Sequence, residues 1–260
     1  MTRLDGKCAL VCGGSDGLGF GAATELASLG CNIILAGRST TKLKEKVEQI
    51  NKINGLENKT VSIDFKNIDK LTTEIKTLVE QGPIQILINN CGGPPPGKLH
   101  EAKTTALSEA FTMHIIASHA ITQLVLPSML ASNYGRIINI VSTSIRQPIM
   151  GLGVSNTIRG AMGSWSKTLS LELADKGITV NCVLPGTTKT GRLQTILDAK
   201  QHKLNLTADE AEALMLEEIP MGRFAEVSEI SKTIAFLASP DSSYITGVNL
   251  QVDGGKIKSI

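Results

Sequence analysis

The feature that most constrains the fold is an alternation of short aliphatic, β-branched runs with longer stretches of helical periodicity. Seven short β-branched runs predict strands, and those that are apolar on both faces predict burial on both sides of a sheet. Amphipathic stretches over 19–30, 40–53 and 158–177 lie between some of them. This arrangement is typical of a parallel sheet covered by helices on both sides. The predicted strands are 8–13, 32–37, 60–64, 84–89, 136–142, 178–184 and 248–252.

The chain length and the absence of a linker predict one domain. The chain has 260 residues, of which 42% are hydrophobic, enough to bury a large core. We find no repeat or low-complexity segment, and the run at 94–96, Pro-Pro-Pro, is too short for a tether. The sequence therefore predicts an α/β fold over 1–260: a single doubly wound Rossmann-type parallel sheet of seven strands with helices on both faces.

Charge and composition argue against several function classes. Lys and Arg number 26 against 24 Asp and Glu, and aromatic residues are 3%, so nothing indicates a nucleic-acid surface. No apolar run approaches the roughly 18 residues of a membrane span, and the first residues lack the apolar stretch of a secretory signal. Five cysteines without CxxC pairs indicate buried thiols in a reducing compartment. We expect a cytoplasmic protein that binds a small molecule and has no metal, membrane or nucleic-acid partner.

Residues 187–222 form a polar insertion with helical periodicity. They contain a capping box between Thr207 and Glu210 and follow the sixth predicted strand. Open α/β folds bind ligands at the carboxyl ends of their strands, which is where this segment emerges. The two interpretations are a lid over the substrate and an ordinary pair of surface helices. We favour the lid because of its position.

A glycine-rich turn connects the first predicted strand to the first helix. Residues 13–19 read Gly-Gly-Ser-Asp-Gly-Leu-Gly. Glycines in such a turn let the backbone approach a pyrophosphate, which then lies at the positive end of the helix. A plain strand-to-helix turn would not need glycines at these spacings. Their placement between a strand and a helix predicts a dinucleotide site.

The end of the second strand indicates which dinucleotide is bound. An acidic residue at this edge pairs with the ribose hydroxyls of NAD, whereas here Gly37 is followed by Arg38. A guanidinium binds a 2′-phosphate in bidentate fashion, and Ser39 and Lys42 could add donors. Asp16 argues the other way, since its carboxylate would repel a phosphate. The sequence predicts NADP(H) in preference to NAD(H).

With these motifs the chain resembles the short-chain dehydrogenase/reductase family, in particular its 3-oxoacyl-carrier-protein reductase-like branch. The resemblance covers nearly all 260 residues. It implies an oxidoreductase that transfers a hydride between NADP(H) and a carbonyl or secondary alcohol, and an oligomer of two or four copies. The matching segments are 13–19, Asp64, 89–92, 135–144, 178–186, 220–224 and 252–255.

The resemblance also implies which residues contact the cofactor. Asp64 would hold the adenine edge, and residues 90–92 would line the nucleotide ribose. Residues 185–190 would contact the nicotinamide amide. The full predicted set is Gly13, Ser15, Asp16, Gly17, Leu18, Gly19, Arg38, Asp64, Phe65, Asn90, Cys91, Gly92, Arg159, Pro185, Gly186, Thr188 and Thr190.

Family chemistry rests on an Asn-Ser-Tyr-Lys set, which this chain matches only at Ser142. Ser155 and Arg159 stand where Tyr and Lys are expected, and His114 stands in place of Asn. A serine is a far weaker acid than tyrosine, whose pKa is about 10, and an arginine does not release its proton readily. A histidine with a pKa of about 6.5 has the range of a general acid or base. The predicted catalytic residues are Ser142, Ser155, Arg159 and His114.

The chain has two tyrosines, Tyr134 and Tyr244, and neither is expected to replace the missing one. Tyr134 precedes the fifth strand, at the amino edge of the sheet, and Tyr244 lies in a turn that we interpret as structural. The segments 89–97 and 155–159 match a sub-branch of reductase-like proteins that shares this altered set. The altered site is therefore interpreted as a feature of that group.

Two function classes follow from this pattern. The first is an enzyme in which Ser142 orients the substrate oxygen, Arg159 stabilises charge, and a water, His114 or the substrate handles the proton. The second is a cofactor-binding protein with weak or no catalysis that acts as a sensor or ligand carrier. We favour the enzyme. A further hypothesis assigns Trp165, Leu169 and Leu173 to a helix face that pairs copies of the chain, with plain core packing as the alternative.

Overall fold

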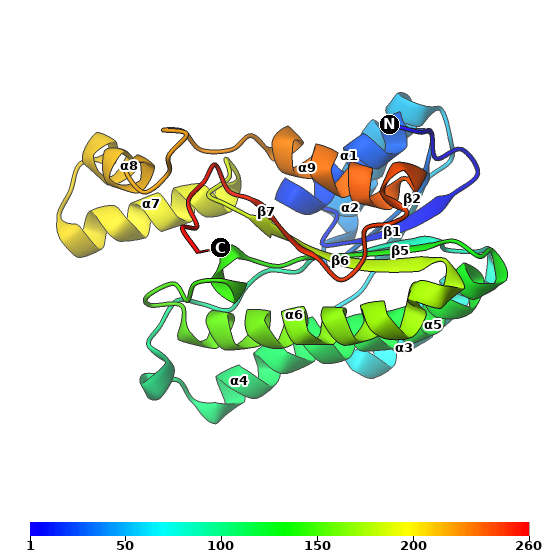
Figure 1. Cartoon of the computed structure of the whole chain (residues 1–260), viewed down its shortest axis with the longest axis horizontal. Coiled ribbons are helices and arrows are strands. Elements are labelled where there is room, and N and C mark those ends of the chain that lie inside the picture. Colours follow the sequence, from blue (N-terminus) through cyan, green and yellow to red (C-terminus); the bar gives the residue numbers. More distant parts are fainter. Residues whose placement is uncertain (260) are drawn as a thin grey trace.

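A computed structural model describes residues 1–259 and shows one sheet of seven parallel strands in the order β3-β2-β1-β4-β5-β6-β7 (Figure 1). The predicted fold class is confirmed. Every pairing between neighbouring strands is parallel, and each crossover between them carries a helix or a longer connection. The strands are β1 (Cys8–Cys12), β2 (Asn32–Gly37), β3 (Lys59–Ser62), β4 (Ile86–Asn89), β5 (Gly135–Ile140), β6 (Ile178–Pro185) and β7 (Asn249–Val252).

The direction of the strand order reverses between β1 and β4. The chain first builds outward from β1 to β3 and then returns to add β4 on the other side of β1. Val11 of β1 consequently pairs with Leu35 of β2 on one side and with Ile88 of β4 on the other. The helices that follow β1 and β4 diverge to opposite faces, which leaves a crevice at the carboxyl ends of these strands.

Helices cover both faces of the sheet (Figure 1). On one face lie α1 (Gly17–Ser28), α2 (Thr40–Asn54) and α9 (Val227–Ala238). The opposite face carries three further helices. They are α3 (Ile68–Glu80), α5 (Ala117–Ala131) and α6 (Gly153–Leu173).

Element ends depart from the prediction where glycines adopt a left-handed backbone. Strand β1 ends at Cys12 because Gly13, placed in the strand by the sequence, has φ +59°. Helix α6 ends at Leu173, before the expected residue 177, and a short 3₁₀ turn leads to Gly177 at φ +70°.

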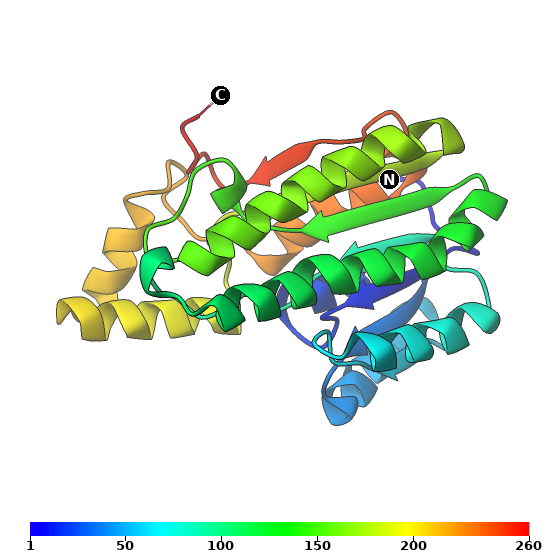
Figure 2. The same cartoon turned by 90° about the horizontal axis from the view of Figure 1, so that it is seen from below.

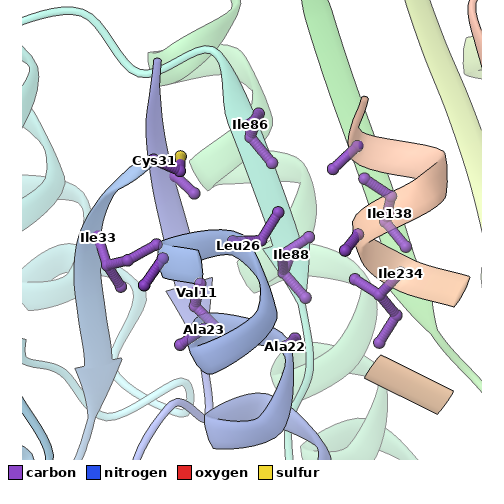
Figure 3. Close-up of a cluster of buried hydrophobic side chains, with 14 of the residues drawn as sticks. Val11, Ala22, Ala23, Leu26, Cys31, Ile33, Ile86, Ile88, Ile138 and Ile234 are labelled. Carbon is purple, nitrogen blue, oxygen red and sulfur yellow. The ribbon is translucent and has the colours of Figure 1, made fainter. Parts of the chain in front are cut away.

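The larger of the two main core clusters lies between the sheet and helices α1 and α9. Leu26 of α1 is completely buried and shares this cluster with Ile86, Ile138 and Ile234 (Figure 3). Ala22, on the same side of α1, is also completely buried, and its small side chain lets the helix lie close to its neighbours. This packing fixes α1, and therefore its first turn, against the sheet.

A long apolar helical stretch runs along the other face of the sheet. Helix α4 (Thr104–Phe111) passes through a π-helical turn, Thr112–Ile116, into α5, and Thr104–Ala131 is long and apolar enough to cross a membrane by length and composition. This apolar stretch was not expected from the sequence, because polar residues interrupt the apolar residues of 104–131. Ile121, Val125 and Met129 on its inner side are completely buried in the core with residues of α3. The apolar character of this side belongs to the protein core.

The segment predicted as a lid forms a helical pair. Helices α7 (Gly191–Leu204) and α8 (Ala208–Leu216) pack on a small apolar cluster that includes Leu193, Met215 and Phe224. The predicted capping box between Thr207 and Glu210 is confirmed. The strand arrows point toward α7 and α8, so the pair lies beyond the carboxyl ends of the strands (Figure 2).

The apolar face predicted on the long helix is wrong at Leu173, while Trp165 and Leu169 are half-buried. Leu173 is only 6% exposed and belongs to the core, and Leu169 packs against the same cluster. Trp165 packs against a neighbouring buried cluster. The exposed apolar residue of this helix is Leu171, which shows 72% of its surface. The sequence prediction misassigned the faces because α6 has small buried residues, such as Ser166 and Ser170, on its inner side.

Replacing Leu26 by Ala removes the side chain that anchors α1 to the sheet. The cavity should lower the free energy of unfolding by about 2–5 kcal/mol, measured as a shift of the urea midpoint. As a control, Lys52→Ala on the exposed side of α2 should change stability by no more than about 0.5 kcal/mol. Equal effects of the two substitutions would contradict the packing described for α1.

Candidate functional site

The glycine-rich loop packs against the end of β4 so closely that side chains are excluded. A Cβ on Gly13 would lie 2.6 Å from Nδ2 of Asn90, and a Cβ on Gly19 would overlap the Gly13 carbonyl oxygen. Asn90 Nδ2 donates a hydrogen bond to that carbonyl at 3.4 Å. Gly13 and Gly17 both have positive φ, at +59° and +49°. The loop thus brings the first turn of α1 to the carboxyl edge of the sheet.

Asp16 has a local structural role at the start of α1. Its carboxylate accepts a hydrogen bond from the Gly17 amide at 2.7 Å, which makes it the N-cap of the helix. The next amides, of Leu18 and Gly19, occupy first-turn positions that have no intrahelical acceptor. A phosphate bound there would meet backbone donors and the positive end of the helix dipole.

Arg38 directly follows Gly37 at the carboxyl end of β2, and Ser15 lies beside Gly37. Arg38 is exposed, and it forms no ion pair with the residues that the structure describes. The Ser15 Oγ lies 3.7 Å from the place where a Cβ on the neighbouring Gly37 would sit. An exposed guanidinium and a hydroxyl at the same strand end are groups that can donate to a ribose 2′-phosphate.

The end of β3 leads to two further predicted cofactor residues. Asp64 accepts a hydrogen bond from the Lys66 amide at 3.0 Å, which holds the turn after the strand. Phe65 is buried and lines a small pocket together with Asn90 and Cys91. The enclosed volume is about 10 Å³, room for about one water molecule. The remaining lining residues are Cys12, Asn89, Met113, His114, Ser118, Ile140, Arg159 and Met162.

Arg159 carries a buried positive charge without a carboxylate partner. It is 9% exposed, and its Nη1 donates to the Ile140 carbonyl at 3.0 Å. Within residues 1–259 no Asp or Glu forms an ion pair with it. Burial lowers the pKa of this guanidinium, although arginine stays protonated. A buried charge of this kind needs acceptors, which a bound ligand would supply.

The two predicted catalytic serines lie near the carboxyl end of β5 and on α6. Ser142 is partly buried and its Oγ accepts a hydrogen bond from the Ser144 amide at 3.1 Å. That bond uses an acceptor lone pair, so the hydroxyl hydrogen is free to donate to a ligand. Ser155 is 7% exposed and lies one turn before Arg159, on the same face of α6.

His114 lies in the π-helical turn, against Cys91. Its Nδ1 is 3.1 Å from the Cys91 Sγ, and it is 4% exposed. Burial, reinforced by the positive charge of Arg159, lowers the pKa of His114 to about 3. The expectation of a pKa near neutrality is therefore wrong. The imidazole is therefore neutral at physiological pH, with one ring nitrogen that donates a hydrogen bond and one that accepts.

The segment that follows β6 closes the other side of the crevice. A Cβ on Gly17 would lie 3.5 Å from Cγ2 of Thr190, so this segment reaches the first turn of α1. Thr188 Oγ1 donates to the Gly186 carbonyl at 3.0 Å, and Thr188 forms a bridge with Ala225. Residues 185–190 and the glycine loop consequently face each other.

Neither tyrosine lies at this edge of the sheet. Tyr134 precedes β5, and its hydroxyl donates to the Ala238 carbonyl at 2.6 Å. Tyr244 is fully exposed in the connection that leads into β7, and its neighbour Ile245 bonds to Asn181 near the start of β6. The structure thus offers no tyrosine close to Ser142.

Sequence reasoning missed a buried polar network beneath the site. Asn89 Nδ2 donates to Asn139 Oδ1, and Asn139 Nδ2 donates to Ser166 Oγ, both at 2.8 Å. The chain of bonds connects β4, β5 and α6 below Ser142 and Arg159. The available signal was an asparagine inside each of two otherwise apolar strands, since a buried amide needs partners.

Comparison with known proteins identifies the family. Residues 13–256 match the family model described as enoyl-(acyl carrier protein) reductase. The chain is 33% identical over 259 residues to the 3-oxoacyl-[acyl-carrier-protein] reductase of Haemophilus influenzae. The alignment covers 97% of this chain and 98% of that protein. This chain therefore belongs to the short-chain dehydrogenase/reductase family of oxidoreductases.

Two solved reductase structures share the fold of this chain over almost their whole length. L-sorbose reductase from Gluconobacter frateurii, complexed with NADPH and L-sorbose, superposes with a TM-score of 0.94 and 25% identity, over 100% of this chain and 99% of that one. YwfH, an NADPH-dependent reductase of bacilysin biosynthesis, superposes with a TM-score of 0.92 and 28% identity, over 98% and 99%.

The depressed pKa of His114 predicts a pH-dependent stability. Above about pH 6.5 the imidazole is neutral in both states, whereas below it only the unfolded chain binds a proton until about pH 3. Stability should fall by about 2 kcal/mol from pH 7 to pH 5 through this group alone. Urea titrations should show that His114→Asn removes this part of the loss, while the exposed His202→Asn does not. Identical pH profiles for all three proteins would contradict the assignment.

Proposed function

We propose that this protein is an NADP(H)-dependent short-chain reductase that interconverts a carbonyl and a secondary alcohol on a small molecule. The observation that carries the proposal is the buried guanidinium of Arg159, which has one carbonyl partner and no carboxylate. It faces the crevice where the fold binds ligands. The NADPH complexes of its structural relatives L-sorbose reductase and actinorhodin polyketide ketoreductase support this choice of cofactor.

The residues of the crevice fit the cofactor part by part. The amides of Leu18 and Gly19 would bind the diphosphate, and Arg38 with Ser15 would bind the 2′-phosphate. Asp64 and Phe65 would border the adenine, and residues 90–92 the adjoining ribose. Residues 185–190 would hold the nicotinamide amide. Asp16 is compatible with this scheme because its carboxylate is already bonded to the Gly17 amide.

The catalytic set would work by placement and charge. The bound nicotinamide supplies or accepts the hydride. Ser142 would donate its hydroxyl hydrogen to the substrate oxygen, and Arg159 would bind the ribose hydroxyls and stabilise negative charge on that oxygen. A pKa of about 3 keeps the His114 imidazole neutral near pH 7, so we assign it a positioning role. Ser155 would hold a water that delivers the proton.

The proposal also covers the number of subunits and the location in the cell, both taken from the resemblance to the family. We infer a 3-oxoacyl reductase-like cytoplasmic enzyme that forms a homodimer or homotetramer. Leu171 of α6 and Leu130 of α5 are exposed by 72% and 43%, which supports an apolar contact between copies. The α7–α8 pair would act as the lid. The sensor or carrier alternative gains no support from the relatives, whose names describe reductases and dehydrogenases.

Arg38→Ala tests the choice of cofactor. Loss of the 2′-phosphate contact should weaken NADPH binding by about tenfold or more and leave NADH binding unchanged, because the guanidinium contributes about 1.5–3 kcal/mol to a charged acceptor. Calorimetric titration of both cofactors measures this. Lys44→Ala, an exposed cation on α2, should change neither affinity. Tighter binding of NADH than NADPH by the unmodified protein would overturn the assignment.

Ser142→Ala tests the catalytic role of the hydroxyl. The substitution should reduce kcat by about 100-fold or more, since it removes the hydrogen bond to the reacting oxygen. The NADPH affinity should remain within about twofold, which separates catalysis from cofactor binding. The readout is the absorbance of the reduced cofactor with a panel of ketones, sugars and acyl thioesters. An unchanged turnover rate would remove Ser142 from the mechanism.

A further inference from the structure

Two guanidinium groups from different parts of the chain converge over Gly93. A Cβ on Gly93 would lie 3.3 Å from Nη2 of Arg192 and 3.6 Å from Nη2 of Arg159. Arg159 reaches this point from α6, beneath the crevice, and Arg192 reaches it from the first turn of α7, in the lid pair. The two nitrogens therefore face the same small region from below and from above.

Neither arginine has an acidic partner among residues 1–259. Every ion pair formed by these residues involves other side chains, and Arg192 makes no side-chain hydrogen bond with them. Other cations of the same region are neutralised. Lys189 pairs with Glu226 at 2.6 Å, and Arg223 pairs with Glu229 at 2.7 Å. Arg192 is the exception among these three.

Two unneutralised cations at one point repel each other, and the repulsion is larger where one of them is buried. The charge of Arg192 indeed lowers the pKa of Arg159, in addition to burial. Without a bound anion, the repulsion between the two arginines lowers the stability of the folded protein. An anion between the two groups would be attracted to both cations, which offsets their repulsion and adds charge-assisted hydrogen bonds.

The phosphates of the cofactor already have other partners in the proposed function, on which this inference rests. The diphosphate is assigned to the first turn of α1 and the 2′-phosphate to Arg38. Arg159 is assigned to the neutral ribose hydroxyls, and because a guanidinium has five N–H donors it can contact a second ligand group as well. Arg192 is therefore left for another negative group, and it approaches from the lid, on the substrate side of the crevice.

We propose that Arg192, with Arg159, binds a carboxylate or phosphate of the substrate, so that the enzyme acts on carbonyl compounds that carry an anionic group. Gly93 contributes by its missing side chain, because a Cβ there would lie 3.3 Å from Arg192 and crowd the two guanidinium groups. Arg192 would be a specificity-determining residue: it binds the anionic end of the substrate, while Ser142 contacts the reacting oxygen. Closure of α7 over the crevice would bring the anion into contact with both cations.

The test uses two matched pairs of carbonyl compounds that differ in charge: acetoacetate against methyl acetoacetate, and 5-ketogluconate against L-sorbose. Binding of each to the NADP⁺ complex, which cannot reduce them, is measured by calorimetry, and turnover is measured with NADPH. At least one anionic member should bind and turn over with at least about a tenfold advantage over its neutral partner.

Arg192→Gln should remove this advantage by raising the dissociation constant of the anionic member about tenfold. The affinity for NADP⁺ and for the neutral member should stay within about twofold. Arg192→Lys should retain part of the advantage, because it keeps the charge and loses the planar pair of donors. Lys203→Gln is the matched control, since it removes one exposed cation from the far end of the same helix.

Three results would overturn the inference. The first is a loss of NADP⁺ affinity in Arg192→Gln, which would assign the residue to the cofactor. The second is equal or better use of the neutral members, and the third is a failure of both anionic members to bind. A protein that binds no nicotinamide cofactor would instead contradict the proposed function, which the same titrations detect separately.

Discussion

The close contact between the glycine loop and the end of β4 determines where chemistry can occur in this protein. Because Gly19 rests on the Gly13 carbonyl and Asn90 bonds to it, helix α1 starts directly above the carboxyl edge of the sheet. The first-turn amides then point into the crevice that the reversal of strand order opens between β1 and β4. Any side chain at these glycines would push the helix away and leave the other site residues without a ligand.

The electrostatics of the site are dominated by cations and by groups that do not titrate near neutrality. Arg38, Arg159 and Arg192 have no carboxylate partners among residues 1–259, whereas burial makes His114 neutral and raises the pKa of Cys91 to about 11. Such a site is suited to binding phosphates and stabilising an oxyanion. It is poorly suited to exchanging protons through its own side chains, which is why the proton is assigned to water.

The fold could be predicted from the sequence because its signals are local. All seven strands occur where short β-branched runs predict them, and the Thr207–Glu210 capping box opens α8 as expected. The predicted ends of helices and strands were less accurate. Gly13 was assigned to β1 although its positive φ ends the strand, and the apolar helix through 104–131 was missed because polar residues interrupt it.

The site could be predicted only in part, because its key interactions join distant segments. The depressed pKa of His114 depends on burial that the π-helical turn creates, and no local pattern encodes it. The convergence of Arg159 and Arg192 over Gly93 requires the positions of α6, α7 and the loop after β4 together. The asparagine network had a visible signal, since Asn139 interrupts an apolar strand, yet its partner Ser166 lies on another element.

The central claim is that a dinucleotide phosphate binds at the first turn of α1. Hydrogen exchange measured by mass spectrometry, with and without saturating NADPH, tests it directly because exchange reports protection of backbone amides. The account predicts slower exchange in peptides that cover residues 13–21 and 38–42, with no change in peptides from α3. Unchanged exchange over residues 13–21, with the cofactor present in excess, would contradict the account.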